Sequence, residues 1–274
     1  MTASTATVTR LGGTIHRSGS LPGLRALVRK DIGEWAHGSR AAVIVVVGSL
    51  FMGLAAANSW LNAWVIANVP EAASASAEKV ISLAPLDNFL AAVASQIFIF
   101  AAIFAAMSLL VRERDSGTLA WVASKPVSRS SILVSKWLSA TAILWLAAGI
   151  IPLTVTTIAV TVLYGAPPIA ATVAAGLGIG AAIGLFVAVV LAASTFVASQ
   201  PAVAGLAFAV FVLPTMVNAV VPFDIAPFEP TSILSWALGA ATGAGVGFVT
   251  PIAWVLGLVG LGAIAGRRMA SLEL

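Results

Sequence analysis

Charged residues divide this chain into four long uncharged stretches. The stretches are residues 41–70, 88–111, 137–223 and 230–266. A helix needs about 20 apolar residues to cross hydrocarbon, so each of the first two stretches predicts one membrane span. The third is long enough for three spans, and Gly and Pro interrupt it at residues 164–168 and 199–201. The fourth predicts one span and a shorter segment, which gives six spans in total.

Composition supports a membrane-embedded chain. Apolar residues make up 60% of the sequence and charged residues 9%, whereas about a quarter of the residues in a soluble domain are charged. Because helices satisfy their own backbone groups in lipid, the pattern predicts an all-α polytopic membrane protein. The absence of cysteine excludes disulfides and thiolate metal sites.

The distribution of Lys and Arg predicts the orientation of the chain. Basic residues gather before the first span, between the second and third spans, and after the sixth. In a six-span chain these three segments lie on one side, which the positive-inside rule assigns to the cytoplasm. Only Lys79 then lies outside. We therefore expect a multi-pass protein of the cytoplasmic membrane with both termini cytoplasmic.

The regions outside the spans differ in character. Residues 1–20 and 267–274 are predicted cytoplasmic tails, the first of them flexible, and they flank a six-span domain over residues 40–266. Residues 21–39 predict an amphipathic helix on the inner leaflet, its basic side toward anionic headgroups; the alternative is a helix packed on the bundle. Its apolar face comprises Leu24, Leu27, Val28, Ile32 and Trp35.

Residues 221–244 form an outer loop that alternates proline with aromatic residues. We expect this loop to dip back into the membrane. A plain interfacial loop is the alternative.

Several functional classes lack the residues that they require. There is no GxxxxGK[ST] phosphate loop, so the chain is not expected to hydrolyse nucleotide. Both histidines, His16 and His37, precede the first span, which disfavours an intramembrane metalloenzyme. The spans carry no charged residue for an ion relay, which disfavours an ion-coupled carrier or a channel. Any transport would then draw its energy from another subunit, although a non-transporting membrane anchor for an ATPase stays an alternative.

The segment at residues 112–136 is the most charged connection, yet it contains Leu119, Trp121 and Val122. A helix capped by Asp115 or Ser116 is predicted to run to about residue 124, and Ser128 or Ser130 is predicted to cap the next helix. A helix of about two turns is unstable alone, so its apolar side chains need a contact. That contact is a groove on a partner protein or, for the tryptophan, the headgroup layer.

The motif in this segment resembles the coupling-helix region of ABC transporter type-2 permeases. It reads Glu113-x-x-x-Gly117-Thr118, then Lys125-Pro126-x-x-Arg129, then Lys136 in the next span. The whole layout is also similar: an amphipathic N-terminal helix, six spans, a coupling helix between spans 2 and 3, and a re-entrant-like loop before span 6, as in type V exporters. Ala120 stands where many relatives carry an acidic residue.

The resemblance implies a permease subunit of an ATP-driven exporter. Its coupling segment would dock on a separate ABC ATPase subunit, with two ATPases and two permeases, most simply a homodimer, in each complex. This chain would bind no cofactor, since ATP and Mg²⁺ would lie on the ATPase. Membrane lipids, and no nucleic acid, would be the other partners of the permease. The implied coupling residues are Arg112, Glu113, Arg114, Gly117, Thr118, Leu119, Trp121, Val122, Lys125, Pro126 and Arg129.

Four amides are candidates for the substrate path: Asn58, Asn62, Gln96 and Asn218. All four are predicted to lie in the outer halves of their spans. In the family that the chain resembles, spans 2 and 5 line the path, so Gln96 and Asn218 would form a polar vestibule above an apolar section. A lipophilic or amphipathic cargo fits such a path. The alternative is that these amides only hydrogen-bond neighbouring helices.

Overall fold

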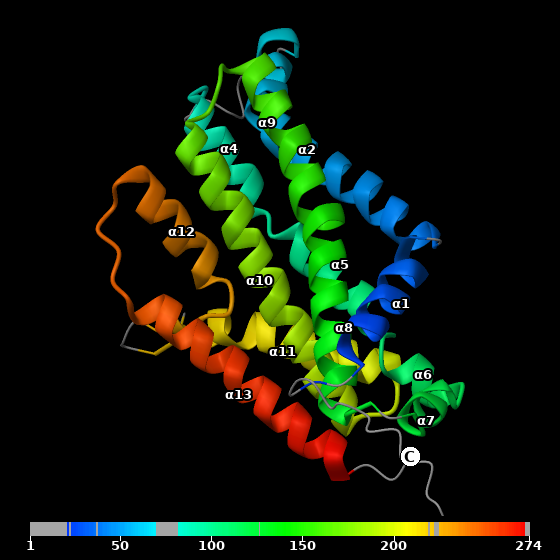
Figure 1. The fold of residues 1–274 in the computed structure, drawn as a ribbon. Coiled ribbons are helices and arrows are strands. Elements are labelled where there is room, and N and C mark those ends of the chain that lie inside the picture. Colours follow the sequence, from blue (N-terminus) through cyan, green and yellow to red (C-terminus); the bar gives the residue numbers. More distant parts are fainter. Residues whose placement is uncertain are drawn as a thin grey trace, which may run out of the picture.

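The computed structural model of this chain is built from α-helices (Figure 1). It describes residues 21, 23–36, 38–69, 82–125, 127–218, 220–221 and 225–271. Within these residues, six helical segments are long and apolar enough to cross a membrane, which confirms the six predicted spans. They are Ser39–Asn68, Pro85–Asp115, Arg129–Leu163, Ile169–Phe196, Gln200–Asn218 and Val249–Ser271. The predicted break at residues 164–168 falls between the third and fourth segments, and the break at residues 199–201 overlaps the start of the fifth. The predicted tail at residues 1–20 lies outside the described residues.

The second and third spans are each assembled from several helical pieces. Span 2 comprises α4 (Pro85–Ala94), α5 (Ile97–Ala106) and α6 (Val111–Asp115). Gln96 separates α4 from α5 in the left-handed region, at φ 53°, which is uncommon for a residue with a side chain. Its depth therefore does not follow from the rise of one continuous helix. Span 3 comprises α8 (Arg129–Leu144), the π-helical turn η1 (Trp145–Ile150) and α9 (Ile151–Leu163).

Helix α10 (Ile169–Phe196) is the centre of the bundle. In the most apolar stretch of α10, 72% of the residues are buried, whereas in the most apolar stretch of α13 (Val249–Ser271) only 6% are buried. Two tryptophans of span 3 contact the glycines of α10. Trp145 Nε1 donates to the Gly176 carbonyl at 2.8 Å, and a Cβ at Gly180 would lie 2.7 Å from the same indole nitrogen. Trp137 Nε1 donates to the Gly184 carbonyl at 2.8 Å. Gly176, Gly180 and Gly184 recur every four residues, a spacing that lets helices approach closely, so these glycines serve close packing.

Two shorter helices lie against the bundle. Helix α1 (Leu24–Ala36) packs on α8 (Figure 1). One face of this helix therefore lies against the bundle, as in the second of the two arrangements that the sequence left open. Helix α12 (Ser232–Thr242) follows the 3-10 turn η2 (Ala226–Phe228) in the predicted outer loop. It packs on α10, where a Cβ at Gly178 would lie 3.0 Å from Leu234. The inner-leaflet position of α1 and the re-entrant path of α12 stay predictions.

Candidate functional site

The segment between spans 2 and 3 folds into the short helix that its sequence predicts. Helix α7 (Thr118–Ala123) follows Gly117, whose φ of 70° suits a residue without Cβ. Ser128 caps α8 as predicted, because its Oγ accepts from the Ser131 backbone N–H at 3.0 Å. Neither Asp115 nor Ser116 caps α7, which has no side-chain cap. Pro126 lies outside the described residues.

One face of α7 is buried by the chain itself. Leu119 and Val122 are 1% and 5% exposed. They belong to a cluster that also contains Ile132 of α8, Ala192 of α10 and Met269 of α13. Helix α7 therefore sits on the ends of spans 3, 4 and 6, and these two apolar side chains are not available to a partner.

The opposite face of α7 is open. Trp121 is 61% exposed although it is a large aromatic side chain. Lys125 Nζ lies 3.5 Å from the centroid of its indole ring, a cation–π contact that orients both side chains. Gly117 and Ala120 are exposed beside them. We call Gly117, Ala120, Trp121 and Lys125 the α7 outer face.

Two arginines of the predicted set bind helix ends within the chain. Arg114 Nη1 donates to the Ser194 carbonyl, near the end of α10, at 3.1 Å. Arg129 Nη1 donates to the carbonyls of Met269 and Ala270, in the last turn of α13, at 2.9 Å each. A cation is favourable at a helix C-terminus, where carbonyls lack intrahelical partners. These arginines hold the segment to the bundle.

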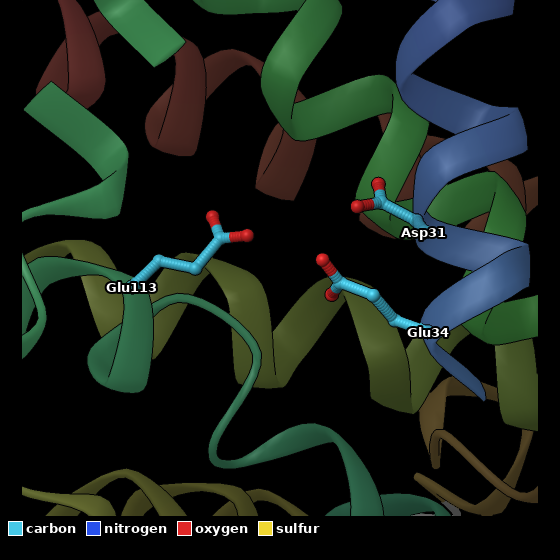
Figure 2. Close-up of side chains that lie close together, drawn as sticks. All are labelled: Asp31, Glu34 and Glu113. Carbon is cyan, nitrogen blue, oxygen red and sulfur yellow. The ribbon is translucent and has the colours of Figure 1, made fainter. Parts of the chain in front are cut away.

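Glu113 joins the segment to α1 and α8 through ion pairs. Its Oε2 lies 2.8 Å from Lys136 Nζ and its Oε1 lies 3.2 Å from Lys30 Nζ. Lys136 also lies 3.9 Å from Asp31, and Lys30 pairs with Glu34 at 3.0 Å. Figure 2 shows the three carboxylates, two from α1 and one from α6, directed toward a common space. We call these five residues the charged cluster.

Asp31 is not among the predicted site residues, although its place in the apolar face of α1 could have identified it. It stands four residues after Leu27 and four before Trp35, so it interrupts the apolar face of α1. In the structure it is 7% exposed and accepts a hydrogen bond from Ser135 Oγ at 3.2 Å. Burial raises the pKa of the Asp31 carboxyl above its ordinary value of 3.8, and Lys136 and Lys30 offset part of this rise. A carboxylate in the apolar face of an amphipathic helix indicates a cation on the facing helix.

The three carboxylates of the charged cluster are close enough together to consider a metal ion. One oxygen of each lies within 4.8 Å of the others. However, Lys30 Nζ lies within 3.8 Å of all three carboxylates. Burial lowers the pKa of Lys30, but its pairs with Glu34 and Glu113 outweigh burial and raise it, so the ammonium stays charged. The lysine thus supplies the positive charge that a metal would bring.

The four candidate path amides come from spans 1, 2 and 5. No hydrogen bond joins them to one another among the described residues. Asn218 Oδ1 accepts from the Ile225 backbone N–H at 3.2 Å, which fixes the start of the outer loop. Gln96 stands at the break in span 2, Asn58 is exposed on α2 (Ser39–Asn68), and Asn62 is partly buried there.

An aromatic cluster lies between spans 2 and 5 instead. The ring of Phe208 in α11 (Gln200–Asn218) lies 5.5 Å from that of Phe100 and 5.4 Å from that of Phe104, both in α5. Phe211 lies 5.4 Å from Phe100. Phe104 is 54% exposed. Spans 2 and 5 therefore present an apolar, aromatic surface.

Comparison with known proteins agrees with this architecture. The sequence profile of the ABC-2 family transporter proteins matches residues 25–236, from α1 to α12. A search of curated proteins found no matching relative. The matched range covers the first five spans, the segment with α7, and the three helices α1, α6 and α8 that the charged cluster joins. This chain therefore belongs to the ABC-2 transporter family, the membrane permease subunits of ABC transporters.

Proposed function

We propose that this chain is the permease of an ATP-driven exporter and that α7 is its coupling helix. The observation that carries this proposal is the two-sided environment of α7. Leu119 and Val122 bind it to the bundle, while Trp121 stays 61% exposed on the opposite face. An exposed tryptophan on a rigidly held helix is typical of an anchor residue for a partner protein. The partner is an ABC ATPase.

Two sets of contacts would carry a movement of α7 into the membrane. The first is the apolar cluster that joins α7 to α8, α10 and α13. The second is Glu113, which lies one turn before α7 and pairs with Lys136 of α8 and Lys30 of α1. Packed cores and buried ion pairs transmit strain because they deform little. Closure of the ATPases would therefore move spans 3, 4 and 6 together with α1.

The assembled exporter would contain two ATPases and two copies of this permease. Each permease offers one α7 outer face, so one ATPase binds each copy, and a homodimer is the simplest arrangement. ATP and Mg²⁺ would be bound on the ATPases. The end of the bundle that carries α7 lies in the cytoplasm on this proposal, as do both termini.

The cargo would be lipophilic or amphipathic and would pass along spans 2 and 5. Phe100, Phe104, Phe208 and Phe211 support this cargo class, since aromatic rings bind apolar surface. Asn218 has a structural hydrogen bond, so it supports the route less than the phenylalanines do.

Replacement of Trp121 by alanine tests the coupling proposal. Loss of a central aromatic anchor typically weakens a protein interface by about 2 kcal/mol or more, or about 30-fold in Kd. We expect the Trp121→Ala permease to insert and stay folded but to lose affinity for its ABC ATPase and transport-coupled ATP hydrolysis. Trp64→Ala is the matched control, because Trp64 is 53% exposed on α2.

The measurement is ATPase binding to the purified permease in nanodiscs, with hydrolysis followed in parallel. Equal affinity and coupled hydrolysis in the wild type, the Trp64→Ala control and the Trp121→Ala variant would refute the proposed role of the α7 outer face. In that event the exposed indole serves as an anchor in the headgroup layer.

A further inference from the structure

A polar cavity opens between α1, the start of α2 and α6. Its volume is about 510 Å³. Charged cluster residues form one wall, and Arg40, Ser108 and Arg112 form another. We call this space the polar cavity.

Arg40, Ser108 and Arg112 line this cavity together. Arg40 Nη1 donates to Ser108 Oγ at 3.1 Å, and the Arg112 backbone N–H donates to the Ser108 carbonyl at 3.1 Å. Over the residues that the structure describes, neither guanidinium pairs with a carboxylate, unlike Lys136, which lines the same cavity and pairs with Glu113. Two guanidinium groups on one wall of a cavity suit a phosphate, which accepts several charge-assisted hydrogen bonds.

An apolar groove begins where the polar cavity ends. Arg40 and Ser108 line both spaces. From there the groove, of about 740 Å³, continues between α2 and α5 past Val47, Phe51 and Phe104. These three side chains are 43%, 50% and 54% exposed. We call this space the α2–α5 groove.

The length of the groove matches one leaflet of a bilayer. Arg40 and Phe51 are eleven residues apart on α2, or about 17 Å at the helical rise. Half of a hydrocarbon core of about 30 Å is about 15 Å. An acyl chain in the groove would thus extend from the arginines toward the bilayer midplane.

We propose that the polar cavity and the α2–α5 groove together bind one anionic phospholipid. Arg40 and Arg112 contact its phosphate, and one acyl chain lies along Val47, Phe51 and Phe104. Basic pockets between transmembrane helices recognise anionic lipid headgroups in this way. A free phosphate would use the arginines alone, whereas the continuous groove requires a hydrocarbon chain. The bound lipid would bridge α1, α2 and α6. The exporter function alone does not require such a ligand.

The experiment measures lipid retention by the full-length protein. Protein is reconstituted in nanodiscs of phosphatidylcholine with about one third phosphatidylglycerol, then released into detergent and examined by native mass spectrometry. We expect the wild type to retain one phosphatidylglycerol per chain. The double variant Arg40→Gln/Arg112→Gln should bind about 25-fold more weakly, about fivefold for each arginine.

Matched controls separate the site from general attraction. Arg25→Gln/Arg29→Gln removes the same charge from exposed positions of α1 outside the polar cavity, and should retain the lipid. Val47→Trp fills the groove without touching the arginines and should abolish retention. Val46→Trp, at a neighbouring position that is 65% exposed and outside the groove, should not.

Three outcomes would overturn the proposal. The first is equal loss of lipid in both arginine pairs, which indicates non-specific attraction. The second is retention unaffected by Val47→Trp together with displacement by inorganic phosphate, which indicates a free anion. The third is disulfide cross-linking between copies through Val47→Cys in lipid-depleted protein, which indicates that a second copy of the chain covers the groove.

Discussion

Replacing Glu113 by glutamine removes the carboxylate that lies between two lysines of the charged cluster. Its side chain is 14% exposed, and that of Lys136 is 5% exposed. The two form the shortest ion pair of the cluster, at 2.8 Å. After the substitution the buried ammonium keeps Asp31, 3.9 Å away, as its nearest anion.

The expected loss of stability follows from this geometry. At 2.8 Å and an effective dielectric constant near 20, the Coulomb attraction is about 6 kcal/mol, and desolvation of both ions offsets much of it. Removal of one partner of a buried pair typically costs about 3–5 kcal/mol. Because Asp31 remains, we expect the lower end, about 3 kcal/mol. For a chain of this size that corresponds to a fall in Tm on the order of 10 °C.

The assay is thermal unfolding of detergent-purified protein, followed as the fraction that remains monodisperse after heating. Glu34→Gln is the matched control, since Glu34 belongs to the same cluster but is 60% exposed and pairs with Lys30 four residues earlier. Such an exposed helical pair contributes about 0.5 kcal/mol or less. Lys136→Met and the double variant complete a cycle that isolates the pair. We expect a coupling energy above about 1 kcal/mol.

Equal Tm values for the Glu113→Gln and Glu34→Gln variants would refute this reasoning. So would additive effects of Glu113→Gln and Lys136→Met, because additivity means that the two residues do not interact. Either result would also remove the second route by which a movement of α7 could reach α8 and α1.

Two further predictions concern packing and protonation. Gly180→Ala places a Cβ 2.7 Å from Trp145 Nε1 and should lower stability by about 1–3 kcal/mol in the same unfolding assay. Gly205→Ala is the control, because a Cβ there would have nothing within 4 Å, and it should be neutral. Equal Tm values for the two variants would contradict the close approach of span 3 to α10. Because burial raises the Asp31 pKa above 3.8, the folded protein holds this proton more tightly than the unfolded chain, so the ionised carboxylate is a net cost above the raised pKa. The stability of Asp31→Asn relative to the wild type should therefore grow as pH rises above about 4 and become constant above the raised pKa. A difference independent of pH would exclude this titration.

The sequence by itself determined the spans and the local structure of the connecting segment. The spans follow from the length of the uncharged stretches and from the Gly and Pro residues that interrupt them, and the start of α8 follows from Ser128. These signals depend only on residues close together in the sequence, so they can be found without knowledge of the fold. The motif from Glu113 to Lys136 likewise identified the family that the sequence profile confirms.

The tertiary structure decided what each residue of that segment contacts. The hydrophobic pattern groups Leu119 and Val122 with Trp121, yet packing buries the first two and exposes the third. The family resemblance implies a partner contact for Glu113 and Arg129, but within the chain Glu113 pairs with Lys30, 83 residues earlier, and Arg129 binds a carbonyl 140 residues later. No local motif marks Asp31 as an ion-pair residue or Gln96 as a break in span 2. The physical reason is that span length and capping depend on neighbouring residues, whereas burial and ion pairing depend on which distant helices meet.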